Sequence, residues 1–485
     1  MSVSNSHPNF PSAAAGFYDE MYDASGKIRP HYEHVYAKLH GMSTERIGRR
    51  QTAIQERMME EGVTYTLYEP NGAEGRERTI PFDLIPRIIP AGEWKRLEAG
   101  LLQRTRALNR FLHDVYHEQE IMKDGIVPRK LIVSNRYFRP EMLRMDVPGG
   151  AYATCAGIDL IRDESGEYYV LEDNLRSPSG YSYLFTCRSM MKRLFHDAYF
   201  DASVAEVEDS LNRFLSVLKS MAPPDRVEPA IALLTPGSYN SAYFEHAFLA
   251  QRMGIELVEG RDLVCKDHKI YMRSVAGWKR IDVVYRRIDD DFLDPLAFRP
   301  DSMLGVAGLM NAYRAGNVAI ANAPGTGVAD DKAIYSYVPD MIKYYLNETP
   351  LLPNVPTYLL SRPEEMEYAL ARLDEMVVKE TSLSGGYGML IGPAATEEEI
   401  RAFAAKIRAN PSNYIAQPTI KLSTAPVYDA GRLVPRHIDL RAFVLTGASG
   451  THVIPGGLTR VAMKEGSLVV NSSQGGGVKD TWVNA

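Results

Sequence analysis

Three oxygen-bearing side chains stand close together in the stretch GIDLIRDESGEYYVLEDNLRSPSG, residues 157–180. The residues DESG at 163–166 favour a tight turn, so the flanking segments predict a β-hairpin. If residue 159 lies opposite residue 170, then Asp159, Val170, Glu172 and Asn174 share one face of that hairpin. Carboxylate and amide oxygens are ligands that Mg²⁺ accepts. The pattern therefore indicates a magnesium site, and the alternative is a strand whose polar residues only face solvent.

A second group of residues is suited to phosphate binding. In MVVKETSLSGGYGMLIG, residues 376–392, Lys379 ends an apolar segment, and a loop with Gly385, Gly386 and Gly388 follows. Glycine lets backbone N–H groups approach phosphate oxygens closely, and the lysine adds a positive charge. The pattern favours a nucleotide site over an ordinary glycine-rich turn.

Two common nucleotide motifs do not fit the chain. The sequence G-x-x-x-x-G-K-[ST] is absent, which excludes a P-loop. The stretch ANAPGTGVADDKA resembles a dinucleotide fingerprint, but Asp330 occupies its third glycine position and no acidic partner follows. We therefore do not expect NAD binding.

Arginines mark a candidate substrate region. Arg176 follows the metal-type strand, and Arg286 and Arg287 end the apolar segment DVVY. Ligands of open α/β sheets bind at the carboxyl ends of the strands, where arginine can grip a carboxylate with two hydrogen bonds. The alternative, that residues 289–291 (Asp-Asp-Asp) neutralise these arginines, is equally compatible with the sequence. In GSYNSAYFEH we favour a helix cap at Asn240 or Ser241 over an anion site.

Composition limits the possible functions. The chain has 485 residues, a formal charge of −6 and three cysteines without zinc-ligand or disulfide spacing. It has neither a signal-peptide pattern nor an apolar run long enough to cross a bilayer. We expect a cytoplasmic protein that binds neither nucleic acid nor membrane.

The elements that must position these groups alternate along the chain. Helical spacing of apolar residues predicts a helix over 93–117, and RKLIVSN at 129–135 resembles a strand. A helical stretch is expected over 188–220, ending at Pro223-Pro224. Residues 229–322 alternate strand, helix and strand, which predicts a parallel sheet. Residues 331–485 are rich in strands and glycine.

Together these motifs resemble the ATP-grasp ligases. The metal-type residues precede the lysine and the glycine loop, an order similar to glutathionylspermidine synthase and closest to the circularly permuted ATP-grasp family, type 2. Supporting stretches are TPGSYNSAYFEHAFLAQRMGIELVEGRDL, YRRIDDDFLDP, NAPGTGVADDKA and GGLTRVA, and the likeness covers about residues 40–485.

The resemblance implies a mixed α/β fold: a circularly permuted ATP-grasp core, a Rossmann-like pre-ATP-grasp domain and an N-terminal helical region. It implies the following division: 1–128, the helical region; 129–225, the metal-binding part of the core; 226–330, the pre-ATP-grasp substrate domain; 331–485, the nucleotide-binding lid with the rest of the core.

It also implies roles for individual residues. Asp159, Glu172 and Asn174 would hold Mg²⁺, Lys332 and Lys379 would contact ATP phosphates, and the loop containing Ser384, Gly385, Gly386 and Gly388 would close over them. Gln417 and Ile420 would line the adenine pocket. Arg441 and Arg460 would stabilise the transferring phosphoryl group, with strand-surface arginines as the alternative.

The implied activity is an ATP- and Mg²⁺-dependent ligation of a small-molecule or peptide carboxylate to an amine through an acylphosphate. Two alternatives remain open: a phosphotransferase, and a catalytically idle nucleotide-binding scaffold that works with a protein partner. No amidase segment is recognised, so glutathione and spermidine are not transferred as substrates. In the tail at 471–485, we expect residues 474–477 to contact the nucleotide, with a flexible end as the alternative. The presence of Lys479 and Trp482 favours the contact.

Overall fold

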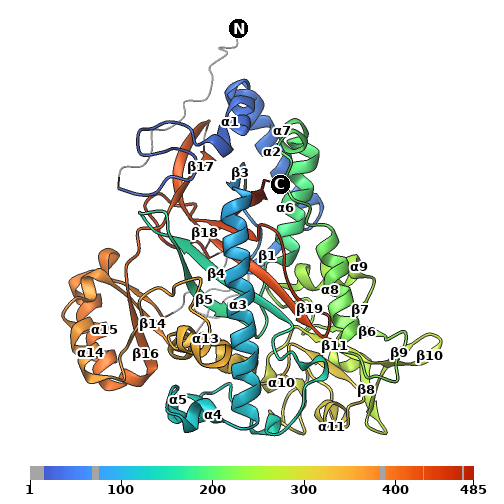
Figure 1. The fold of residues 1–485 in the computed structure, drawn as a ribbon. Helices are drawn as coiled ribbons and strands as arrows, with labels where there is room; N and C mark the ends of the chain where they lie inside the picture. Colours follow the sequence, from blue (N-terminus) through green and yellow to red (C-terminus); the bar gives the residue numbers. More distant parts are fainter. Residues whose placement is uncertain (1–15, 68–75, 383–387, 430, 472–474, 485) are drawn as a thin grey trace.

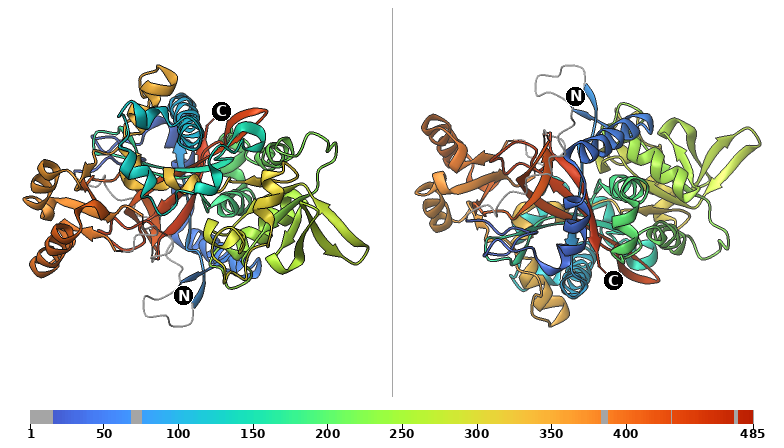
Figure 2. Two further views of the ribbon diagram at one scale, coloured as in Figure 1. Left: turned by 90° about the horizontal axis from the view of Figure 1, so that it is seen from below. Right: turned by 90° about the horizontal axis from the view of Figure 1, so that it is seen from above.

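A large, mostly antiparallel sheet lies at the centre of the molecule (Figures 1 and 2). On one side of it is a smaller sheet within residues 358–418, called the lid sheet below, and on the other side is a parallel sheet. The structure is a computed structural model, and it describes residues 16–67, 76–382, 388–429, 431–471 and 475–484. The mixed α/β fold expected from the sequence is confirmed.

The central sheet combines both ends of the chain. Its strand order is β3 (Phe82–Ile89), β21 (Gly477–Val483), β20 (Leu458–Val461), β18 (Arg432–Gly447), β4 (Cys155–Arg162) and β5 (Tyr168–Asn174). The strands β17 (Thr424–Asp429) and β19 (Gly450–Val453) also pair with β18. The N-terminal region is therefore more than a helical region, because β3 belongs to the core sheet.

Lys479 and Trp482, which favoured a functional tail in the sequence, have structural roles instead. Of residues 474–477, for which the nucleotide contact is expected, Gln474 lies outside the described residues. Lys479 and Trp482 both lie on β21, which is paired on both sides, with β3 and with β20. The Lys479 ammonium is buried against the Asp83 carboxylate and donates to the carbonyl oxygens of Ile85 and Pro426. Trp482 is fully buried. These side chains belong to the core of the fold.

The hairpin at 157–180 forms, but its register differs from the simple expectation. Leu160 lies opposite Val170, and Asp159 lies opposite Glu172, with the register shift between Asp159 and Leu160. Leu171 is thus an extra residue, as in a β-bulge. The bulge brings the two carboxylates directly opposite one another and moves Val170 to the other face.

Helices cover the central sheet. The long helix α3 (Ala91–Tyr116) runs past it (Figure 1) and packs on β18, β19 and α13 (Val338–Leu346). Further helices of this part of the chain are α1 (Glu33–His40), α2 (Thr44–Glu60) and α4 (Glu120–Lys123), with a hairpin of β1 (Thr64–Leu67) and β2 (Arg76–Thr79).

The segment 129–135 is not a strand. It forms the short helix α5 (Arg129–Val133) after Pro128, and only Ile132 of this helix is buried. The periodicity of a short apolar run does not distinguish a helix from a strand, and a single helical turn is enough to bury one side chain.

The helical stretch expected at 188–220 forms three helices: α6 (Tyr181–Leu194), α7 (His196–Asp201) and α8 (Asp209–Ser220).

The predicted parallel sheet is confirmed. Its order is β12 (Ala319–Ala321), β11 (Val283–Arg286), β6 (Ile231–Leu234) and β7 (Glu256–Val258), and all three pairings are parallel. Its helix α9 (Tyr243–Met253) has Ala242 as its N-cap, two residues beyond Asn240 and one beyond Ser241, the two expected caps. The helix ends at Gly254, which has φ of +64°. A three-stranded sheet of β8 (Leu263–Lys266), β9 (Lys269–Ser274) and β10 (Gly277–Ile281) projects beyond it (Figure 2). The short helices α10 (Asp290–Leu293) and α11 (Leu309–Arg314) follow.

The described part of the lid combines a small sheet with two α-helices. Its antiparallel sheet runs β13 (Tyr358–Leu359), β16 (Tyr414–Pro418), β14 (Met376–Glu380) and β15 (Leu390–Ile391), with helices α14 (Pro363–Leu370) and α15 (Glu397–Ala409). The short helix α12 (Lys332–Tyr335) precedes it. No helix in the described parts of the chain is long and apolar enough to span a membrane.

Candidate active site

Neighbouring strands of the central sheet align charged side chains in a ladder. Arg441 on β18 lies opposite Asp159 on β4, which lies opposite Glu172 on β5. Two residues before Arg441, Asp439 lies opposite Arg460 on β20. Because side chains of directly opposed residues share a face, the sheet itself brings these groups together.

Asp159 joins the two arginines. Its Oδ1 and Oδ2 accept from Arg441 Nε and Nη2 at 2.6 and 2.7 Å, and Oδ2 also accepts from Arg460 Nη2 at 2.8 Å. Burial alone would raise the pKa of Asp159, but Arg441 and Arg460 hold that pKa below its ordinary value. Asp159 is therefore a carboxylate that stays ionised in a buried position.

Asp439 was not singled out from the sequence. It is buried, and both its oxygens accept from Arg460, which is thus held between two carboxylates. The signal was present in the segment HIDLR, because strand alternation places residues 439 and 441 on one face.

The proposed metal ligands Glu172 and Asn174 stand next to Asp159. Glu172 Oε1 lies 3.7 Å from Lys332 Nζ, and the Nδ2 atom of Asn174 is buried without a hydrogen-bond partner. The described residues include no group of three or more His, Cys, Asp and Glu side chains arranged to hold a metal. The donor chemistry still fits Mg²⁺, since the carboxylates of Asp159 and Glu172 and the amide of Asn174, whose oxygen is the ligand atom, line one cavity.

Lys379 faces this cluster from the lid. Its Nζ donates to Gln417 Oε1 at 2.8 Å, and Gln417 Nε2 donates to Thr357 Oγ1 at 2.9 Å. Burial lowers the pKa of Lys379 to about 8, although Glu172 acts in the opposite direction. An anion in contact with this ammonium would favour its charged form.

A first cavity lies between the lid and the hairpin. Its apolar end includes Ile161, Leu171, Val377, Ile391, Ile420 and Leu468. Its polar end is formed by Asp159, Glu172, Lys332, Lys379, Asp439 and Arg460. An apolar slot that leads to a cluster of cations and carboxylates suits a base attached to a chain of phosphates.

A second cavity adjoins the first. Asp159, Glu172, Lys332, Arg460 and Asn471 line both. The second cavity continues past Asn174, Arg176 and Arg441 to the loop Ser177–Gly180 and the start of α9. Two ligands could therefore meet at the shared carboxylates and cations.

The family model for circularly permuted ATP-grasp type 2 matches residues 86–462. The chain belongs to this family. The match confirms the resemblance inferred from the order of the metal-type residues and the strand lysine.

Several proteins are similar to this chain over most of its length. An uncharacterized protein of Synechocystis sp. is 51% identical over 96% of this chain and 97% of its own length. An uncharacterized protein of Mycobacterium tuberculosis is 49% identical over 96% of this chain and 84% of its own length. A Frankia alni protein is 42% identical over 96% of this chain but only 54% of its own length; its name is that of a glutamate–cysteine ligase, marked there as provisional.

A solved structure supports the ATP-grasp fold. A glutathione synthetase-like effector from Globodera pallida superposes with a TM-score of 0.59 over 90% of this chain and 96% of its own, at 12% identity. At this identity the likeness concerns the fold alone.

Most of the predicted site residues line the first or the second cavity. Lys332, Lys379, Gln417, Ile420 and Arg460 line the first cavity. Of the predicted glycine loop, Ser384, Gly385 and Gly386 lie outside the described residues, and Gly388 is exposed with φ of +67° beside Met389, which lines the first cavity.

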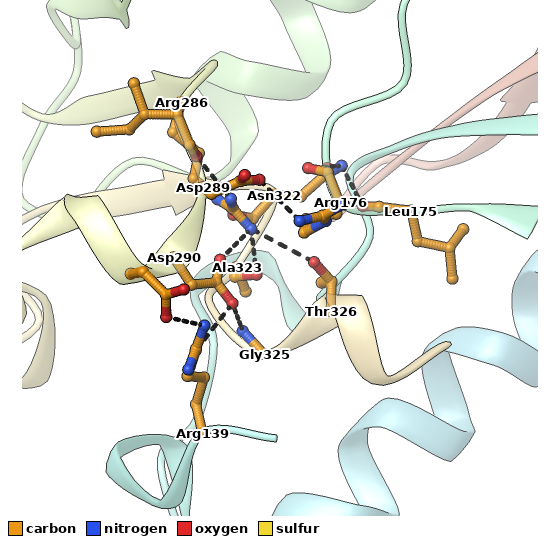
Figure 3. A network of polar contacts seen from close by, with 12 residues as sticks. Arg139, Leu175, Arg176, Arg286, Asp289, Asp290, Asn322, Ala323, Gly325 and Thr326 are labelled. Atoms are coloured by element: carbon orange, nitrogen blue, oxygen red, sulfur yellow. Dashed lines mark hydrogen bonds and ion pairs between the residues drawn. The ribbon is translucent and has the colours of Figure 1, made fainter. Parts of the chain in front are cut away.

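Of the three predicted substrate arginines, one lines a cavity and two are buried in ion pairs. Arg176 lines the second cavity, where its Nη1 donates to Asp289 at 2.8 Å. Arg286 is buried: it pairs with Asp290 at 2.7 Å and donates to the carbonyl oxygens of Asn322 and Ile288 (Figure 3). The ion-pair alternative therefore describes Arg286, whose guanidinium joins the parallel sheet to the segments around it.

Arg287 is also buried, and its carboxylate partner is Glu245 of α9, at 2.8 Å. Neither Arg286 nor Arg287 is among the residues that line the two cavities. A pattern of charges along one segment could not predict Glu245 as the partner of Arg287, because docking of separate elements brings the two together.

Proposed function

We propose that this protein is an ATP- and Mg²⁺-dependent ligase that joins a carboxylate to an amine through an acylphosphate. The observation that carries the proposal is the junction of the two cavities at Asp159, Glu172, Lys332 and Arg460. A nucleotide in the first cavity would direct its terminal phosphate toward a carboxylate in the second.

Residues of the lid and the core sheet would divide the binding of ATP. The apolar end of the first cavity would hold the base beside Ile420, while Lys379 and Lys332 would bind phosphate oxygens. Gln417 would keep the Lys379 ammonium in position through the hydrogen bond described above. Glu172, Asn174 and Asp159 would hold Mg²⁺, which neutralises phosphate charge when bound.

Arg460 and Arg441 would stabilise the transferring phosphoryl group. Both guanidinium groups are held in place by carboxylates before any ligand arrives, so little reorganisation is needed at the moment of reaction. The carboxylate oxygen attacks the terminal phosphorus and ADP leaves. The amine then attacks the acyl carbon, phosphate leaves, and the amine gives up a proton. Small-molecule or peptide carboxylates and amines are the expected substrates.

Hydroxylamine trapping tests this proposal. The protein is incubated with Mg²⁺·ATP, hydroxylamine and a panel of amino acids and short peptides, and ADP and hydroxamate are both measured. We expect equal amounts of the two for at least one carboxylate, and neither with Lys379→Met. ADP without hydroxamate would indicate a phosphotransferase. Absence of both products, together with no binding of Mg²⁺·ATP, would contradict the proposal.

A further inference from the structure

The loop Ser177–Gly180 forms a wall of the second cavity. It follows β5 after Leu175 and Arg176 and leads into α6. On one side, Arg441 Nη1 donates to the carbonyl oxygen of Ser179 at 3.2 Å. At its end, Gly180 has φ of +120°, and a Cβ atom there would lie 3.0 Å from Phe443 Cζ. The backbone of this loop therefore has little freedom on the side of the central sheet.

Arg287 holds the same loop from the parallel sheet. It follows β11, and its Nη1 donates to the carbonyl oxygen of Pro178 at 2.6 Å. Its Nη2 donates to Ser179 Oγ at 3.2 Å and to Glu245 Oε1 at 2.8 Å. The guanidinium thus binds two consecutive loop residues and one residue of α9.

Glu245 completes the arrangement. Its Oε2 accepts from the backbone N–H of Gly180 at 2.7 Å and of Ser182 at 3.1 Å, and from Ser182 Oγ at 3.2 Å. The start of α6 has no side-chain cap of its own, so a carboxylate from α9 satisfies these donors. The same carboxylate lies near the positive end of the α6 dipole.

The pair is inaccessible to a ligand. The side chains of Arg287 and Glu245 are 2% and 0% exposed. A buried ion pair is expensive unless its remaining hydrogen-bonding groups are used. Here most of them are used on the loop and on Ser182 at the start of α6, while Arg287 Nε is buried without a partner among the described residues. The contacts therefore indicate that this pair binds the loop and not a substrate.

We propose that Arg287 and Glu245 are positioning residues of the ligation: together they fix the loop Ser177–Gly180 as a wall of the carboxylate cavity. The inference rests on the proposed function, and it replaces direct substrate binding by Arg287. Through this pair, the parallel sheet would determine how well the carboxylate substrate binds in the second cavity, without changing the binding of the nucleotide.

The test compares two variants with a matched control. Arg287→Met combined with Glu245→Gln removes the arginine without leaving an unpaired buried charge, while Glu245→Gln alone keeps an acceptor for the Gly180 N–H. The control is Lys279→Met with Glu256→Gln, an exposed ion pair between β10 and β7, which is the edge strand of the parallel sheet. Amide hydrogen exchange of a peptide over 177–184 is measured on each protein, with the thermal shift caused by Mg²⁺·ATP. The Michaelis constants (KM) are measured for ATP and for the carboxylate found by hydroxylamine trapping.

We expect the double variant to exchange its amides over 177–184 about tenfold faster or more, with an unchanged Mg²⁺·ATP shift. Its KM for the carboxylate should rise about tenfold or more, with the KM for ATP unchanged. Glu245→Gln alone should retain most of the protection, and the control should match the wild type.

Unchanged exchange in the double variant would overturn the proposal, and so would an equal rise of both KM values. If the double variant fails to fold, Glu245→Gln alone tests the proposal through the same amide exchange rates and KM values. Smaller increases in the exchange rate and in the KM for the carboxylate are then expected. A wild type that forms no hydroxamate would contradict the ligation itself. The exchange comparison would then still show whether the pair holds the loop.

Discussion

Replacing Lys379 by methionine should stabilise the protein without nucleotide while removing its response to ATP. The folded state lowers the pKa of Lys379 from 10.5 to about 8. Each pKa unit corresponds to about 1.4 kcal/mol, so keeping this ammonium charged costs at most about 3 kcal/mol at pH 7. Loss of the hydrogen bond to Gln417 offsets about 1 kcal/mol of that gain. The expected net gain is about 1–2 kcal/mol.

The sign of the pH dependence follows from the lowered pKa. Between pH 8 and 10.5 the unfolded chain binds more protons at this lysine than the folded chain, so wild-type stability rises with pH there. At pH 9.5 the remaining cost is about 1.4 kcal/mol, and the difference between variant and wild type should shrink by about 2 kcal/mol from its value at pH 7.

Urea unfolding of the wild type and Lys379→Met at pH 7 and pH 9.5 measures this difference. The exposed Lys343, changed to methionine, serves as the control and should have little effect at either pH. A difference between Lys379→Met and wild type that does not depend on pH would refute the account of a charged lysine buried in the first cavity.

Three further predictions concern the core sheet. Asp159→Asn should lower the free energy of unfolding by about 3–5 kcal/mol, because it leaves the buried Arg460 and the partly buried Arg441 without their shared carboxylate. Urea unfolding checks this, and a loss below about 1 kcal/mol would contradict the pairing. Deletion of residues 477–485 should prevent folding, since β21 lies between β3 and β20. Circular dichroism checks this, and a truncated protein that unfolds cooperatively would be inconsistent with that topology. Gly180→Ala should cost about 1–3 kcal/mol, because of its positive φ and the close Phe443 ring; thermal unfolding at the wild-type temperature would show that the loop accommodates a Cβ atom.

Local patterns predicted the hairpin and the parallel sheet. The hairpin carries an alternating pattern and a strong turn signal within 24 residues, so its existence required no tertiary information. The bulge at Leu171 could not be predicted from counting residues away from the turn, because the register depends on which face the core selects.

Partners distant in sequence were the main obstacle. Lys479 and Trp482 resembled residues of a terminal extension, yet their strand pairs with β3, almost 400 residues earlier. Arg286 and Arg287 stood beside acidic neighbours in the sequence, but Glu245, Asn322 and the loop at 177–180 became partners only through docking of separate sheets. Asp439 was the one missed residue of the site whose strand spacing from Arg441 already indicated its place.

Binding of Mg²⁺·ATP tests the central claim most directly. Isothermal titration of the wild type with ATP, with and without Mg²⁺, is compared with Glu172→Gln and Lys379→Met. The account predicts one Mg²⁺-dependent site per chain, weakened about tenfold or more in both variants, since each removes a charge that contacts the metal or the phosphates. Binding that is equally strong in the wild type and both variants, or no binding to the wild type, would contradict it.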